Sequence, residues 1–246
     1  MTVDVRASTR IVADLDALAA EAIGVVADAA ADAIRERGRF VVALAGGTTP
    51  KGLYARLAAP PVRQRLDWSR TWIFFGDERC VPPTDKDSNY LMAYEAMLGA
   101  VPIPPDQIFR IPGEAPDPTA AAAEYERRLR ATFEPAPVRF DLILLGMGVD
   151  GHTASLFPGS PALDERVRLV VALDARAAAV RARITLTLPV LNAARHVLLL
   201  VSGAEKARPV ADALRNAAST LPVARVRPTG GLLTWLLDRA AAANLK

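Results

Sequence analysis

The sequence contains a single cysteine, Cys80, and only two histidines, His152 and His196, among its 246 residues. One cysteine excludes an internal disulfide framework, and two histidines exclude a three-histidine or HExxH zinc site. The apolar runs fall far short of the ~20 residues that a membrane span needs, and the N-terminus lacks the charged-then-apolar pattern of a signal peptide. The sequence therefore predicts a soluble, cytoplasmic protein of a reducing compartment, with no metal, no cofactor and no membrane contact.

An excess of charge of one sign is also missing. Thirty Lys and Arg residues stand against twenty-seven Asp and Glu residues, which leaves a net charge of +3 without a basic block. This balance argues against a nucleic-acid partner and remains compatible with a small phosphorylated substrate.

A chain of this length with 51% hydrophobic residues forms a substantial core. We expect one domain over residues 1–246, acting as a monomer or weak homo-oligomer, with a small excursion around residues 100–135 between two proline clusters.

Short, continuous apolar runs are typical of strands that are covered on both faces, and such strands are usually parallel. These runs span residues 39–45, 71–76, 140–146, 167–173, 184–188 and 197–202, with 223–226 as a weaker seventh. Helical patterns span residues 11–37, 50–58, 88–98, 119–133, 204–217 and 231–243. Gly38 is placed to end the first helix in a left-handed conformation. The alternation predicts an α/β fold of three α/β/α layers around a mostly parallel, Rossmann-like sheet.

A glycine-threonine turn leaves the first of these strands. Gly46 and Gly47 permit a tight turn with accessible backbone N–H groups, while Thr48 and Thr49 add hydroxyls at the positive end of the helix that follows. These features suit a phosphate-binding loop. The spacing is not that of a P-loop, and an ordinary strand-to-helix turn explains the pattern equally well.

A second glycine-rich segment follows the strand at residues 140–146. Gly146, Gly148 and Gly151 satisfy G-x-G-x-x-G, and Asp174 lies near the spacing of a ribose-binding acid. Pro158 and Pro161 nevertheless interrupt the long helix that a dinucleotide site needs. We therefore favour a close-approach turn that presents side chains above the carboxyl end of a strand, where open α/β sheets bind ligands.

His152 is the natural general base of the chain, because histidine is largely free to accept a proton near neutral pH. Asp150, two residues earlier, would orient the ring or stabilise the imidazolium. The alternative is a histidine that only hydrogen-bonds within its turn, and His196 fits that structural role well. Cys80 has no feature that would stabilise a thiolate beyond Arg79, and no G-x-S-x-G elbow of a serine hydrolase occurs.

Charged residues at other strand ends would complete a site for an anionic substrate. Asp77, Glu78 and Arg79 follow the strand at 71–76, Arg183 precedes the strand at 184–188, and Lys206 follows the exit of the strand at 197–202. Taken singly, each is better explained by a solvated surface charge or ion pair.

Several segments together resemble the 6-phosphogluconolactonase family, which is grouped with glucosamine-6-phosphate isomerases. They are residues 46–50, 76–79, 146–159, 183–189 and 202–206, in order along almost the whole chain. The segment 146–159 is long and specific, whereas the glycine-threonine loop is shared with other sugar-phosphate proteins. The resemblance implies the α/β/α fold of glucosamine-6-phosphate deaminases. It also implies hydrolysis of 6-phospho-D-glucono-1,5-lactone in the oxidative pentose phosphate pathway, without a metal or nucleotide.

Carried over by position, the resemblance implies that the loop Gly46 to Thr49 binds phosphate with Arg183 and Lys206. His152 then activates water, with Asp150 and Arg79 in supporting roles and Asp77, Glu78 and Gly148 elsewhere in the cleft. A deaminase-type isomerase is the nearest alternative, but its pattern has an acidic residue where this chain has Phe157. A non-catalytic sugar-phosphate sensor is another alternative, although the helix-turn-helix of such regulators is missing.

Overall fold

The computed structural model describes residues 6–174 and 181–245. Its main sheet has six strands in the order β1-β9-β8-β5-β2-β3, and every neighbouring pair in that sheet is parallel. The strands are β1 (Arg6–Val12), β2 (Phe40–Leu44), β3 (Thr71–Phe75), β5 (Leu142–Leu145), β8 (His196–Val201) and β9 (Leu232–Asp238). The expected α/β fold with a mostly parallel sheet is therefore confirmed.

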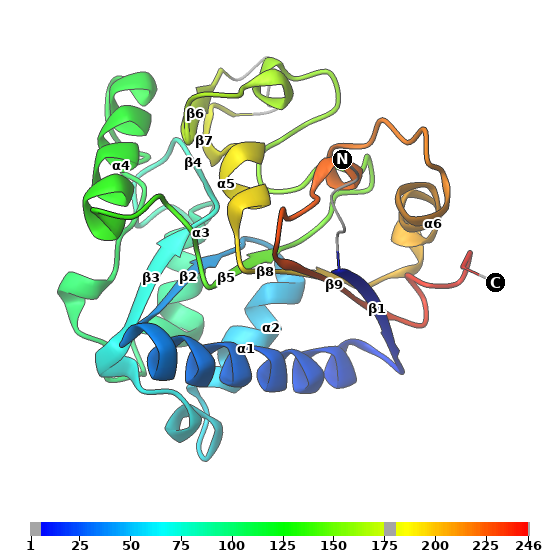
Figure 1. The fold of residues 1–246 in the computed structure, drawn as a ribbon, viewed down its shortest axis with the longest axis horizontal. Coiled ribbons are helices and arrows are strands. Elements are labelled where there is room, and N and C mark those ends of the chain that lie inside the picture. Colours follow the sequence, from blue (N-terminus) through cyan, green and yellow to red (C-terminus); the bar gives the residue numbers. More distant parts are fainter. Residues whose placement is uncertain (1–5, 175–180, 246) are drawn as a thin grey trace.

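The strands at the centre of the sheet are buried throughout, as their apolar sequences predict. Every residue of β2 and of β5 is buried, because helices cover both faces. Helices α1 (Leu15–Arg37) and α2 (Thr48–Ala58) pack together on one face, and α5 (Leu188–Ala193) lies on the other (Figure 1). Asp14 caps the start of α1 through the N–H of Ala17, and Gly38 ends it with φ 76° as predicted.

Two predicted strands lie outside the main sheet. β6 (Val170–Leu173) and β7 (Arg183–Leu186) pair antiparallel with each other, and β7 also pairs antiparallel with β4 (Asp77–Arg79). The expectation of parallel pairing was therefore wrong for residues 167–173 and 184–188. Their continuous apolar character has another cause, because α4 (Pro118–Phe133) covers this small second sheet. The small sheet brings Arg183 and Arg79 opposite each other in register.

The two ends of the chain differ most from the sequence-based expectation. Residues 231–243, predicted as a helix, contain β9, and residues 223–226, predicted as a strand, lie largely in a 3-10 turn, Pro222–Arg225. The helix predicted over 11–37 begins at Leu15, after β1. β9 lies inside the sheet between β1 and β8, α1 packs against it, and all of its residues except Leu232 are buried, which accounts for its apolar run. A continuous apolar run does not distinguish such a strand from a buried helix.

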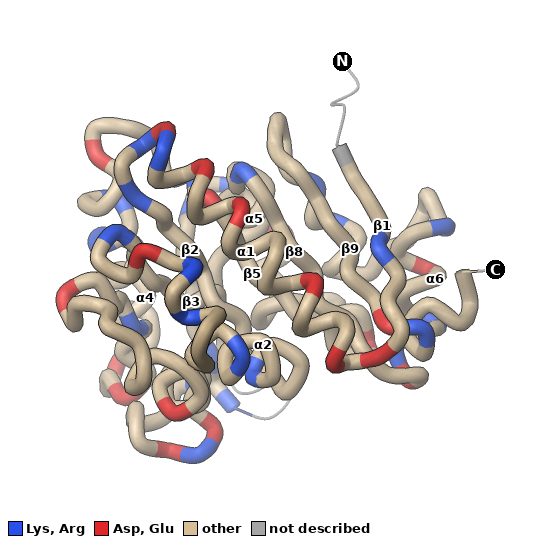
Figure 2. Tube along the Cα trace, turned by 90° about the horizontal axis from the view of Figure 1, so that it is seen from below, with Lys and Arg blue, Asp and Glu red and all other residues tan. Residues whose placement is uncertain are grey.

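The remaining helices connect the layers. α3 (Asn89–Ala93) continues directly into a π-helical turn, Tyr94–Leu98, and α6 (Ala207–Arg215) follows β8. Between Pro102 and Asp117 the chain forms only one short 3-10 turn, Pro105–Gln107, before α4 begins. Basic and acidic positions are interspersed along the trace (Figure 2). No helix within the described ranges combines the length and hydropathy required to cross a membrane.

Two buried tyrosines fix the ends of neighbouring strands in the main sheet. The Tyr54 hydroxyl accepts a hydrogen bond from the N–H of Ala45 and donates one to its carbonyl oxygen, just after β2. The Tyr125 hydroxyl does the same for Phe75 at the end of β3. Backbone groups at these strand exits are thus satisfied without a further strand. The tyrosines position the segments that leave the sheet toward the site described next.

Candidate active site

A cavity lies at the carboxyl ends of β2, β5 and β8. The chain passes from β2 to β3 on one side and from β5 to β8 on the other, so the strand order reverses between β2 and β5. Open α/β sheets bind ligands at this switch point. The cavity has a volume of about 310 Å³. Its lining includes ten predicted site residues: Gly46, Gly47, Thr48, Thr49, Asp77, Arg79, Gly148, His152, Arg183 and Lys206.

The loop from Gly46 to Thr49 forms the amino end of helix α2. Gly47 has φ 102°, a conformation that side-chain-bearing residues rarely adopt, and α2 starts at Thr48. The helix has 11 residues, so its free N–H groups and dipole face the cavity with partial positive charge. A β-carbon on Gly46 would lie 2.0 Å from Oδ1 of Asn89. Glycine is therefore required there for the loop to pack against that amide.

Three cationic side chains from separate elements reach the same cavity. Arg183 begins β7, Arg79 ends β4, and Lys206 lies in a short 3-10 turn after β8. Burial lowers the pKa of Arg183, and the nearby Arg79 charge adds to that effect against the opposing influence of Asp77. Lys206 has no ion-pair partner within the described residues. This convergence of positive charge suits a dianionic group such as phosphate.

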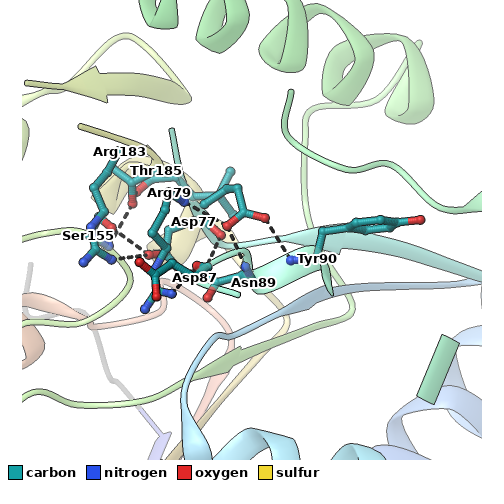
Figure 3. A network of polar contacts seen from close by, with 10 residues as sticks. Asp77, Arg79, Asp87, Asn89, Tyr90, Ser155, Arg183 and Thr185 are labelled. Atoms are coloured by element: carbon teal, nitrogen blue, oxygen red, sulfur yellow. Dashed lines mark hydrogen bonds and ion pairs between the residues drawn. The ribbon is translucent and has the colours of Figure 1, made fainter. Parts of the chain in front are cut away.

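Asp77 connects three of the segments that line the cavity (Figure 3). One carboxylate oxygen, Oδ2, accepts the Ser155 hydroxyl at 2.6 Å and lies 3.8 Å from Nη1 of Arg183. The Asn89 amide donates to the other oxygen at 3.2 Å and to the backbone carbonyl of Asp77 at 2.9 Å. Asp77 is buried. Its carboxylate therefore ties the Arg183 strand and the loop after His152 to the Asn89 amide.

Glu78 faces away from the cavity, toward the start of α3. Its carboxylate accepts hydrogen bonds from the backbone N–H groups of Asn89 and Tyr90 and from the Ser88 hydroxyl, at 2.7–3.0 Å. Burial raises the pKa of Glu78, although these hydrogen bonds oppose the effect. Glu78 does not line the cavity. It fixes the segment that places the Asn89 side chain against Gly46.

His152 and Asp150 form a close pair at the edge of the cavity. Nδ1 of the imidazole lies 2.6 Å from Oδ1 of Asp150, and Asp150 itself lies outside the cavity lining. Burial alone would raise the pKa of Asp150, but the hydrogen bonds from His152 outweigh it and the pKa is lowered. A carboxylate only accepts hydrogen bonds, so the tautomer with the proton on Nδ1 satisfies this contact and has its lone pair on Nε2. The Phe157 ring packs against the imidazole, with centroids 4.6 Å apart.

Several lining residues were not found by sequence reasoning. They include Asn89, Ala154, Ser202 and Glu205. Ser202 and Gly203 are held by the Asp238 carboxylate at the end of β9, a contact between segments 35 residues apart. Ala154 has a positive φ of 48°. A non-glycine residue in that conformation is strained, and such strain clusters at functional sites. Asn89 carries no local pattern, whereas Ala154, Ser202 and Glu205 lie in the segments 146–159 and 202–206, whose resemblance to the family did not single them out as lining residues.

The glycine-rich segment after β5, His196 and Cys80 each have surroundings unlike those of His152. After Gly151 the chain forms turns and a bridge between Thr153 and Leu156 rather than a helix, so this segment supplies no helix N-terminus of the kind that a dinucleotide site needs. His196 bonds Thr234 at 2.9 Å, away from the cavity, in the structural role expected of it. Burial raises the pKa of the Cys80 thiol. Within residues 6–174 and 181–245, no three His, Cys, Asp or Glu side chains lie together as a metal site requires.

The chain is similar to proteins of known sequence and structure over nearly its whole length. A curated 6-phosphogluconolactonase from Nostoc sp. strain PCC 7120 is 42% identical over 243 residues, which cover 97% of this chain and 98% of that protein. The 6-phosphogluconolactonase structure from Trypanosoma brucei superposes with a TM-score of 0.84 at 30% identity, covering 99% of this chain and 100% of that one. A monomeric glucosamine-6-phosphate deaminase has a TM-score of 0.80 at 25% identity, covering 96% and 99%. The model of the family "glucosamine-6-phosphate isomerases/6-phosphogluconolactonase" matches residues 13–235, and the chain belongs to this family.

Proposed function

We propose that this chain hydrolyses 6-phospho-D-glucono-1,5-lactone to 6-phosphogluconate, the second step of the oxidative pentose phosphate pathway. The observation that carries the proposal is the paired His152 and Asp150 beside a cavity that also contains a helix N-terminus, Arg183 and Lys206. Hydrolysis of a phosphorylated ester needs a phosphate-binding region and a general base. A phosphate held at one end of the substrate positions the carbonyl carbon at the other end beside the base.

In the proposed mechanism, the phosphate binds the N–H groups of the loop Gly46 to Thr49 together with Arg183 and Lys206. Nε2 of His152 removes a proton from water as the oxygen attacks the lactone carbonyl carbon. Asp150 stabilises the resulting imidazolium, and Arg79 lies in the same cavity as a donor for the developing negative charge on the carbonyl oxygen. The ring C–O bond then breaks, and the imidazolium returns its proton to the departing oxygen.

Phe157 favours hydrolysis of a lactone over the deaminase reaction. The ring packs against His152 and lies 5.6 Å from the Arg183 guanidinium, so it occupies the position next to both functional groups. An aromatic ring cannot transfer a proton, which the acidic residue of the deaminase pattern would do. The ring instead shields the imidazole and packs beneath a cation.

The test is hydrolysis of freshly prepared lactone, measured against its spontaneous opening, with glucosamine 6-phosphate as the control substrate. We expect His152→Ala to lower kcat about 10²–10⁴-fold, and Arg183→Ala to raise mainly KM because it removes a phosphate contact. His196→Gln, which lies outside the cavity, is the matched control for His152. Near-full turnover by His152→Ala would refute the assignment of the base. Activity on glucosamine 6-phosphate without activity on the lactone would refute the proposed substrate.

A further inference from the structure

A second cavity of about 390 Å³ lies at the opposite end of the same strands that carry the active site. Its charged lining residues are Arg37, Arg39, Arg139, Arg195 and Asp141. Arg39 immediately precedes β2, Arg139 precedes β5 by a few residues, and Arg195 immediately precedes β8. Because β2, β5 and β8 are adjacent and parallel, their amino ends meet at one edge of the sheet. From Arg39 to Gly46 the chain advances seven residues in extended or nearly extended form, so the cavity lies ~23 Å from the phosphate loop.

The single carboxylate in this cavity does not neutralise the four arginines. Asp141 is buried, and its Oδ1 accepts a hydrogen bond from Nε of Arg37 at 2.8 Å. Its Oδ2 accepts the backbone N–H of Val41 at 2.8 Å. Nε of Arg195 is 3.5 Å from Oδ1, too far for a hydrogen bond of normal geometry. Asp141 therefore hydrogen-bonds Arg37 and Val41, and its contact with Arg195 is an ion pair without a hydrogen bond.

Two of the arginines retain unused donor capacity. Nε of Arg139 and Nε of Arg195 are shielded from solvent and have no hydrogen-bond partner among residues 6–174 and 181–245. Within the described residues, Arg139 donates only to the carbonyl oxygen of Gly230, at 3.0 Å, and Arg195 donates no side-chain hydrogen bond. The pKa of Arg195 is lowered by burial first and then by the charges of Arg37 and Arg139. Asp141 pairs with Arg37 and Arg195, and Glu36 pairs with Arg37, so two negative charges stand against four arginines and positive charge remains in excess here.

The fourth arginine is held in place. Arg39 donates to the carbonyl oxygen of Thr132 at 2.6 Å, and its guanidinium lies 4.8 Å from the centre of the Trp72 ring. Such fixed, planar guanidinium groups suit phosphate oxygens better than flexible ammonium groups do. The cavity volume lies at the lower end of the range of small-molecule sites, ~300–1,000 Å³.

We propose that this cavity, which we call the arginine pocket (Arg37, Arg39, Arg139, Asp141 and Arg195), is a second binding site for a compact polyanion carrying a diphosphate group. Arg139 and Arg195 supply the principal donors to the phosphate oxygens. Either free pyrophosphate or the diphosphate of a nucleotide provides this chemistry. The proposal is independent of the catalytic activity, because it concerns the opposite edge of the sheet.

The test observes the arginine Nε–H signals by nitrogen-15 NMR while pyrophosphate is added. The signals of Arg139 and Arg195 are assigned with Arg139→Lys and Arg195→Lys, which keep the charge. We expect both signals to shift and to saturate, and ADP to reproduce the shift if the pocket accepts a nucleotide, whereas adenosine does not. The Arg183 signal reports the active site separately in the same spectra. Sodium chloride at matched ionic strength is the control for general screening.

The same titration is repeated with the double variant Arg139→Gln/Arg195→Gln. The backbone signals of Val41 and Asp141 monitor pyrophosphate binding at the pocket. We expect the affinity for pyrophosphate to fall about tenfold or more in this variant. Arg35→Gln is the matched control, because Arg35 lies near the same end of α1 outside the pocket and its side chain is 66% exposed. The proposal is overturned if the wild-type signals of Arg139 and Arg195 do not saturate, or if sodium chloride shifts them equally. Since those spectra are of the wild-type chain, this outcome does not depend on the folding of a variant.

Discussion

Gly148 lies against the His152 imidazole so closely that a β-carbon on Gly148 would be 2.1 Å from Nδ1 of His152. The same β-carbon would be 2.5 Å from Oδ1 of Asp150. These two atoms form the 2.6 Å contact that orients the proposed base. Glycine at this position is therefore a condition for the His152–Asp150 pair, and not only for the turn itself.

We accordingly expect Gly148→Ala to separate the pair and to reduce kcat about 10²-fold, because a displacement of ~1 Å in a catalytic group has effects of this size. Steady-state kinetics on the lactone measure the change. Gly52→Ala is the matched control: a β-carbon there meets no atom within 4 Å, and the residue lies inside α2. That control should keep its activity and gain about 0.5–1 kcal/mol of stability. An unchanged kcat in Gly148→Ala would show that the pair is not required for turnover.

Asp77→Asn tests the carboxylate that joins Arg183 to the loop after His152. The amide cannot provide the same two acceptor oxygens and leaves the buried Arg183 charge less compensated. We expect KM to rise more than kcat falls, and the free energy of unfolding to drop by about 1–3 kcal/mol. Lactone kinetics and urea unfolding measure the two effects.

The control for Asp77 is Asp87→Asn. Asp87 pairs with Arg181 at 3.3 Å, and both side chains are more than one third exposed. Such surface pairs contribute about 0–1 kcal/mol, so this variant should behave nearly as the unchanged chain does. If both variants gave the same small effect, Asp77 would have no special part in positioning Arg183.

The sequence predicted those parts of the site that glycine marks. Gly46, Gly47 and Gly148 stand at strand exits where the backbone must turn or approach another group closely, and the residues beside them line the cavity. Asn89 and Glu205 also line it but carry no such signal. Asn89 reaches the cavity because Glu78 binds the backbone at the start of α3, a contact between residues 11 apart. Side-chain contacts of this kind cannot be inferred from local patterns.

The fold was predictable where apolar runs are bounded by turn signals, as for β2, β3, β5 and β8. β9 was not, because its run Leu232–Asp238 continues into alanines that favour a helix, and only the pairing with β1 and β8 makes it a strand. Tertiary context overrides local preference at such positions. The antiparallel pairing of β6 and β7 was missed for a similar reason, since covering by α4 gives the same apolar pattern as burial within a parallel sheet.

Tyr54→Phe and Tyr125→Phe should each destabilise the fold. Each hydroxyl satisfies one backbone N–H and one carbonyl at the end of a strand, and both tyrosines are fully buried. Leaving such groups without partners costs about 1–3 kcal/mol, which chemical denaturation would detect. Tyr94→Phe, at a tyrosine that is 46% exposed, should change stability by no more than about 0.5 kcal/mol. Equal stability of all three variants would contradict the assigned role of the buried hydroxyls.

His196 should make the stability of the protein depend on pH between about 6.5 and 4. Burial, with a smaller contribution from Arg10, lowers the pKa of His196 to about 4. The unfolded chain therefore binds a proton at this histidine at higher pH than the folded chain does. The stability that His196 contributes is present above pH ~6.5 and is lost as the pH falls toward 4. The free energy of unfolding should fall by about 2–3 kcal/mol.

Urea unfolding at pH 7 and pH 4.5 measures this change. The free energy of unfolding should differ less between the two pH values in His196→Gln than in the unchanged chain. Thr234→Val, which removes only the hydrogen-bond partner of the ring, should retain the difference. A difference that survives in His196→Gln would assign the acid sensitivity to other groups.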